Sequence, residues 1–133
     1  MRIRAWSSVA FVLVLASGAG ACRKFITLPT TREPVISSAV AFPTTLGPGD
    51  STMITVVASD PAGAPLVYDW EASNGLTIKG TKGGWLYNTA SPTMVFYAPT
   101  TWPYPTDTAF VWCGVRDSRG GEAQRQVLIY YSN

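Results

Sequence analysis

Apolar and polar residues alternate from residue 35 onward in the two-residue period of half-buried β-strands. The alternation is clearest in residues 51–59, 66–71 and 109–115, and clusters rich in glycine, proline, asparagine and aspartate separate these runs. A helical period does not fit this part of the sequence. Because about seven short strands in ~100 residues suit a two-sheet sandwich, we predict one antiparallel all-β sandwich domain in residues 34–133.

The same alternation predicts which side chains form the core. Trp70 is the large aromatic residue expected on the inner face of its strand. Cys113 is expected to be a buried free thiol that packs as a small hydrophobic group. The other inward positions that we predict are Ile54, Val56, Ala58, Leu66, Tyr68, Ala109, Val111, Val115, Val127, Ile129 and Tyr131.

Two segments resemble a known family of domains. In residues 57–70 a strand ends at Asp60, the chain turns through a D-x-x-G segment, and the next strand carries Y-x-W; residues 115–121 read as a closing hairpin turn. Both resemble bacterial PKD-like and related immunoglobulin-like modules, and the likeness covers residues 35–131. It implies an immunoglobulin-like β-sandwich but no particular role, because this fold carries many functions. Residues 79–92 depart from the family pattern and are expected to be an insertion or an irregular edge.

The start of the chain has the layout of a bacterial export signal. Arg2 and Arg4 form a positive beginning, residues 9–16 are a continuous apolar run, and residues 17–21 are all small. The apolar run is about half of the ~20 residues that a membrane-spanning helix needs. We therefore predict a cleaved signal peptide in residues 1–21.

Cys22 follows the predicted cleavage point directly. The four residues that end in Cys22 resemble the lipobox of bacterial lipoproteins, although leucine is more usual where Ala19 stands. The resemblance implies a diacylglyceryl group on the Cys22 thiol, which would anchor the protein in a membrane. Ordinary secretion is the alternative, because an A-x-A site also guides the general signal peptidase. In that case a disulfide between Cys22 and Cys113 could form in an oxidising envelope.

Residues 22–33 contain two prolines and no regular apolar period, so we expect them to be an extended tether. By resemblance to lipoprotein sorting, Arg23 is not the aspartate that retains a lipoprotein at the inner membrane. This favours the outer membrane of a diderm bacterium, within the cell envelope; a protein without the lipid would be secreted.

The residue inventory argues against catalysis. The chain has no histidine and only two cysteines, which excludes histidine-based nucleophilic catalysis and the usual zinc sites. Asp69 and Glu71 share the outer face of one strand, where acidic residues are usually solvated surface. Asp60 and Asp117 are better explained as turn caps than as calcium ligands. We predict a protein with no enzymatic activity, no cofactor and no bound metal.

The charge of the chain argues against nucleic acid as a partner. Once Arg2 and Arg4 are removed with the signal peptide, basic and acidic residues are equal in number. A neutral chain lacks the basic surface on which nucleic-acid binding depends.

Four aromatic residues are the candidates for a binding site: Trp85, Tyr87, Trp102 and Tyr104. They fall in stretches that we predict to be irregular, off the alternating core faces. There they could stack on sugars or anchor a protein partner, or Trp102 and Tyr104 could close the end of the core.

The sequence therefore favours a non-catalytic envelope lipoprotein whose domain binds an envelope protein or a glycan. The alternative is an architectural subunit or spacer of a membrane-tethered or extracellular assembly. Exposed, coplanar aromatic rings would favour a glycan ligand, whereas a large apolar patch or an uncovered edge strand would favour the architectural role.

Overall fold

The computed structural model describes residues 33–132. The predicted signal peptide (1–21), Cys22 and nearly all of the predicted tether (22–33) lie outside the described residues. Within those residues the chain forms β-strands and no helix. The strands are β1 (Val35–Phe42), β2 (Thr45–Leu46), β3 (Ser51–Ser59), β4 (Leu66–Ala72), β5 (Thr77–Ile78), β6 (Trp85–Thr89), β7 (Thr93–Tyr97), β8 (Thr108–Asp117) and β9 (Glu122–Tyr131).

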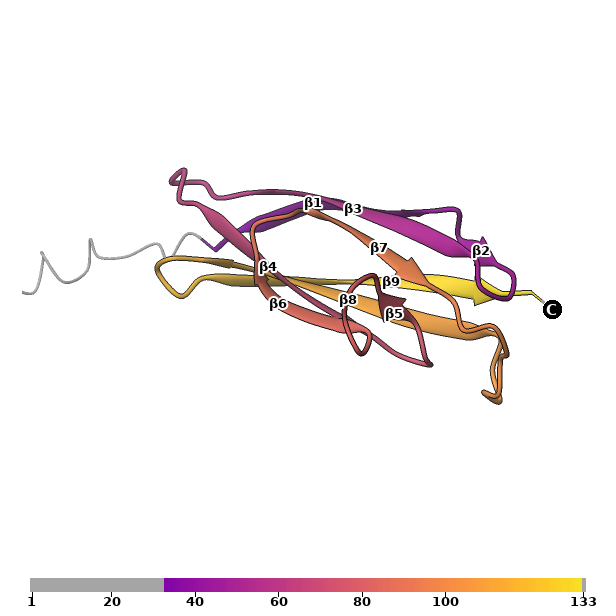
Figure 1. The fold of residues 1–133 in the computed structure, drawn as a ribbon. Helices are drawn as coiled ribbons and strands as arrows, with labels where there is room; N and C mark the ends of the chain where they lie inside the picture. The colour runs from indigo at the N-terminus through magenta and orange to yellow at the C-terminus, as the bar shows by residue number, and fades with distance from the viewer. Residues whose placement is uncertain (1–32, 133) are drawn as a thin grey trace, which may run out of the picture. The chain divides into compact units, whose positions relative to one another are not determined.

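The strands form two sheets that pack face to face (Figure 1). One sheet has the order β1-β3-β7-β5, and the other has the order β2-β9-β8-β4-β6. Neighbouring strands are antiparallel except β2 and β9, which pair in parallel. The prediction of an immunoglobulin-like all-β sandwich is confirmed. The two strands beyond the predicted seven are β2, which has only two residues, and β6, which lies in the stretch 79–92 that was expected to be an insertion or an irregular edge.

The core lies between the sheets and is built from the inward positions of the long strands. Trp70, Val111, Cys113 and Val115 are fully buried, as the alternation predicts. The ring of Trp70 contacts that of Phe96 on the opposite sheet, with centroids 6.0 Å apart. Trp70 therefore fills the space between the layers, and its replacement by alanine would cost about 3–5 kcal/mol.

The turn after β3 has the geometry that its residues dictate. The Oδ1 atom of Asp60 accepts the Ala62 N–H at 2.6 Å, and the Asp60 carbonyl accepts the Gly63 N–H at 2.9 Å. Gly63 adopts a φ of 73°, which a glycine tolerates without a steric cost. The turn connects β3 in the four-stranded sheet to β4 in the five-stranded sheet. The candidate site lies on this second sheet.

Candidate functional site

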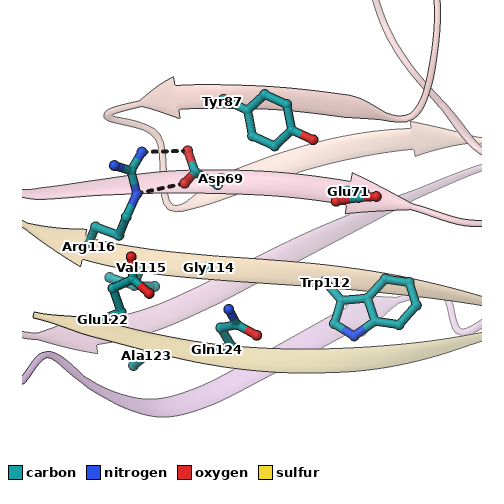
Figure 2. Close-up of a pocket in the computed structure, with 10 residues that line it drawn as sticks. All are labelled: Asp69, Glu71, Tyr87, Trp112, Gly114, Val115, Arg116, Glu122, Ala123 and Gln124. Carbon is teal, nitrogen blue, oxygen red and sulfur yellow. Dashed lines mark hydrogen bonds and ion pairs between the residues drawn. The ribbon is translucent and has the colours of Figure 1, made fainter.

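A hollow of about 260 Å³ lies on the outer face of the five-stranded sheet, over β6, β4, β8 and β9 (Figure 2). It exists because outward-facing side chains of different sizes stand next to each other on neighbouring strands. The residues that line it are Asp69, Glu71, Tyr87, Trp112, Gly114, Val115, Arg116, Glu122, Ala123 and Gln124.

Gly114 forms the floor of the hollow. It sits in the middle of β8, paired with Asp69 on one side and with Gln124 on the other. A Cβ added at Gly114 would meet the Cβ of Asp69 at 3.8 Å, an ordinary contact. Glycine weakens a strand interior and often marks a place where another group approaches the backbone closely. Here the missing side chain creates the open space.

An ion pair forms one wall of the hollow. Arg116 donates from Nε to Asp69 Oδ2 at 2.7 Å and from Nη2 to Asp69 Oδ1 at 3.1 Å. Nη2 also donates to Asn88 Oδ1 at 2.7 Å, and the Asn88 N–H donates to Asp69 at 2.8 Å. Burial acts to raise the pKa of the Asp69 carboxyl, but these hydrogen bonds and the Arg116 charge outweigh it and lower that pKa. Both charged groups are therefore held in place and already paired.

Two other carboxylates and an amide remain available to a ligand. Glu71 and Glu122 form no ion pair within residues 33–132, and both are exposed, as is Gln124. Carboxylates accept hydrogen bonds from hydroxyl groups, and the Gln124 amide can both donate and accept. The hollow can therefore hydrogen-bond a ligand that is rich in hydroxyl groups.

Trp85 and Tyr87 lie on β6 beside the hollow. Their ring centroids are 6.1 Å apart and their planes differ by 18°. The two residues are 58% and 50% exposed, although apolar rings are normally covered. The prediction that they lie in an irregular stretch is wrong: β6 is a regular strand that pairs with β4 at the edge of the sheet, with a register shift between Tyr68 and Trp70. The strand has five residues and follows two glycines, so the alternation of the sequence did not reveal it.

Trp112 is a residue of the site that the sequence analysis did not single out. It projects from the outer face of β8, is 40% exposed, and lies near Phe110 with ring centroids 5.9 Å apart. Glu71 pairs in register with Trp85 on one side and with Trp112 on the other, so the two indoles flank this carboxylate. Figure 2 shows Tyr87 and Trp112 on either side of the strand that carries Asp69 and Glu71. An outward-facing tryptophan in an alternating strand was the available signal.

Trp102 and Tyr104 are far less available than the pair on β6. Trp102 stacks on Tyr131 with centroids 4.3 Å apart and planes 14° from parallel, and its Nε1 donates to the Thr106 carbonyl at 2.6 Å. Tyr104 meets the edge of Trp102 and covers the turn at Gly75. Of the two roles that the sequence left open for this pair, the structure places it over the end of the core.

Asp60 and Asp117 come together at one pole of the sandwich, with Arg119 between them. Arg119 Nη2 lies 2.9 Å from each carboxylate oxygen of Asp60 and 3.9 Å from Asp117 Oδ2. Asp117 Oδ1 also accepts the N–H groups of Arg119 and Gly121. The Arg119 guanidinium thus lies between the two carboxylates, where a metal cation would otherwise bind. The Oδ1 atom of Asp117 caps the turn through its two backbone hydrogen bonds. Within residues 33–132 no group of three or more possible metal ligands is found.

The outer face of the other sheet is uncharged and carries several exposed apolar side chains. Strands β1, β3 and β7 contain no charged residue. Phe42 is 81% exposed and pairs in register with Met53, which is also exposed. The other exposed apolar side chains of these strands are Val35, Val40 and Val57. β1 also forms an edge of its sheet.

Comparison with known proteins shows the fold. No protein-family model and no curated protein matches the chain. Among solved structures, the chain is similar to a nucleoside hydrolase-related protein from Saccharophagus degradans that is associated with carbohydrate metabolism, with 18% identity and a TM-score of 0.55. The match covers 75% of this chain and 26% of that one, so this chain spans about a quarter of its length. At this identity the likeness shows the sandwich fold alone.

Two further solved structures are similar to the chain. One is the PKD domain of a peptidase from a Thermoplasmatales archaeon, with 20% identity, coverage of 76% and 94%, and a TM-score of 0.46. The other is a lipoprotein from Bacteroides thetaiotaomicron, with 15% identity, coverage of 80% and 85%, and a TM-score of 0.46.

The described part of the chain contains no helix that is both long and apolar enough to cross a membrane.

Proposed function

We propose that this protein is a non-catalytic, glycan-binding module of the bacterial cell envelope. The observation that carries the proposal is the exposed Trp85–Tyr87 pair beside a hollow with polar walls. A sugar ring presents an apolar face of C–H groups and an edge of hydroxyl groups. Aromatic rings cover the first, and carboxylates and amides bind the second.

The geometry of the outer face supports a glycan better than a small apolar ligand. Trp85 and Trp112 stand two strands apart, roughly 10 Å, with Glu71 between them. This spacing is comparable with the length of a disaccharide. The surface is open and the polar groups are exposed, which suits a solvated chain that is bound along its length.

The anchor proposed for this module is a lipid on Cys22, preceded by the signal peptide in residues 1–21. The lipid would hold the domain at a membrane surface of the envelope, and the segment 22–33 would separate the domain from it. With this arrangement the module would connect the membrane to a glycan in the envelope. Residence at the outer membrane is part of the proposal, and it rests on Arg23.

A second function is favoured by one specific observation. The outer face of the four-stranded sheet is uncharged and exposes Val40, Phe42 and Met53, and β1 is an edge strand. Such a face suits an architectural subunit that joins a larger assembly. The two roles use opposite faces of the sandwich, so they are separable by mutation.

A glycan array tests the proposed function. The purified mature protein is applied to an array of neutral, amino-bearing and acidic oligosaccharides, and the best binder is titrated by calorimetry. Trp85→Ala and Tyr87→Ala are each expected to weaken binding by about tenfold or more, as central aromatic contacts do. Phe42→Ala is the matched control: it removes a more exposed aromatic ring from the opposite face and should leave the affinity unchanged.

Two results would overturn the glycan proposal. One is an absence of binding across the array. The other is binding that Phe42→Ala weakens and Trp85→Ala does not, which would favour the architectural face instead.

A further inference from the structure

The charges around the hollow indicate which glycans it can accept. Asp69, Glu71 and Glu122 place three carboxylates among its lining residues, and Arg116 places one guanidinium there. Arg116 is bound to Asp69 and Asn88, so its charge is already neutralised by a partner. A ligand that enters the hollow therefore meets two carboxylates that make no ion pair within residues 33–132. These are Glu71 and Glu122, of which Glu122 lies opposite Arg116 in register.

We propose that the hollow over Gly114 binds a single sugar ring without acidic groups, and that a ring with a protonated amino group binds it most tightly. This inference rests on the proposed function and names the ligand class of the same site. The volume of about 260 Å³ lies just below the roughly 300 Å³ at which pockets begin to enclose drug-sized molecules. One ring fits, and the rest of the oligosaccharide extends over Trp85.

The aromatic walls act in the same direction as the carboxylates. Tyr87 and Trp112 border the hollow, and the negative faces of aromatic rings attract cations. An ammonium group is thus favoured by two kinds of contact. A carboxylate, sulfate or phosphate group would face Glu71 and Glu122 with like charge. Arg116 could bind such a group only by giving up its bonds to Asp69 and Asn88.

Three oligosaccharides of equal length test the inference: a neutral glucose oligomer, a glucosamine oligomer and an oligogalacturonate. They are titrated into the purified mature protein at low and at moderate salt. The expected order of affinity is glucosamine, then glucose, with no measurable binding of galacturonate. The preference for glucosamine should shrink as salt screens the exposed carboxylates.

Charge-neutral variants identify the groups responsible. Glu71→Gln and Glu122→Gln should each reduce the affinity for the glucosamine oligomer by roughly two- to fivefold, the contribution of an exposed charge pair. In each variant the affinity for the glucose oligomer should fall less than that for the glucosamine oligomer, because glutamine keeps an oxygen that can accept a hydrogen bond from a sugar hydroxyl. Asp107→Asn is the matched control, since it removes one exposed carboxylate outside the hollow and should change neither affinity.

The outcomes separate this inference from the function on which it rests. If the oligogalacturonate binds as tightly as the neutral oligomer, the inference is overturned and glycan binding stands. If a lysine-rich peptide binds through Trp112 and Glu71 while all three sugars fail, the glycan function is overturned as well.

Discussion

Arg116 and Asp69 lie on neighbouring strands of the five-stranded sheet, and the guanidinium binds both carboxylate oxygens, at 2.7 and 3.1 Å. Two parallel N–H···O bonds fix the orientation of both groups more firmly than a single contact would. The pair is only partly covered: the side chain of Arg116 is 36% exposed and that of Asp69 is 23% exposed. Because an exposed ion pair adds little to the stability of a fold, its main effect is on the shape of the hollow. The ion pair forms one wall of the hollow, and it keeps the Arg116 guanidinium bound to Asp69 so that a ligand cannot pair with it.

Acid should destabilise the domain through its paired carboxylates. The pKa values of Asp60 and Asp69 are lowered in the folded state, in each case because hydrogen bonds and an arginine charge outweigh the effect of burial. A lowered folded-state pKa gives stability that is present above the unfolded value, about 3.9, and is lost as the pH falls through the folded value. The free energy of unfolding from urea titrations should therefore hold steady between about pH 7 and 5 and decline below about pH 4.

Asp69→Asn tests whether this ion pair contributes to the acid response. Its free energy of unfolding should fall less steeply with acid than that of the unmodified protein. An identical acid profile in the two proteins would contradict the assignment.

Trp102 should matter for stability and Trp85 should not. Trp102 stacks on Tyr131 and packs against the core, so Trp102→Ala should lower the free energy of unfolding by about 2 kcal/mol, less than for a fully buried ring. Trp85 is 58% exposed, so Trp85→Ala should change the free energy of unfolding by less than about 0.5 kcal/mol. Urea unfolding of both variants makes the comparison, and equal losses would contradict the different roles assigned to the two tryptophans.

The sandwich fold and its buried face could be predicted from the sequence, for identifiable physical reasons. Two-residue alternation marks the buried face of a long strand, which is why Trp70 and Cys113 were predicted inside. Alternation does not tell which strands become neighbours. The contact between Asp69 and Arg116 depends on β4 lying next to β8, which periodicity leaves undetermined.

The sequence carries a signal for the floor of the site that the two-residue alternation does not detect. Gly114 interrupts the apolar and aromatic run of residues 109–115, and a glycine inside a strand often marks a place where another group approaches the backbone closely. Alternation identifies the inward residues of β8 as core, but it assigns no role to the outward ones. Trp112 is another outward-facing residue of β8, two positions before Gly114, and alternation assigns it no role either.

Cys113 should be unreactive in the folded protein. Burial raises the pKa of its thiol from 9.0 to about 12, with a further contribution from the charge of Asp69. At pH 8 such a shift leaves about a thousandfold less thiolate, the reactive form. In a Cys22→Ser variant, where Cys113 is the remaining cysteine, an aromatic disulfide reagent should modify it only after denaturant is added. Rapid modification without denaturant would show that the thiol is accessible.

Gly114→Val should fill the hollow and keep the fold. The position has room for a Cβ and does not have a positive φ, and a strand interior favours a β-branched residue over glycine by roughly 0.5–1 kcal/mol. The variant should therefore be as stable as the unmodified protein or more so, and it should fail to bind the best oligosaccharide of the array. Retained affinity in a folded Gly114→Val protein would place the ligand elsewhere.

The central claim is that a glycan binds the outer face of the five-stranded sheet, and amide chemical-shift mapping tests it most directly. The oligosaccharide that binds best on the array is titrated into ¹⁵N-labelled protein. The account predicts shifts at the backbone amides of Trp112, Gly114 and Gln124 and at the indole N–H of Trp85, with Val40, Phe42 and Met53 unmoved. Chemical-shift changes at Val40, Phe42 and Met53, with no change at the Gly114 amide, would contradict the account.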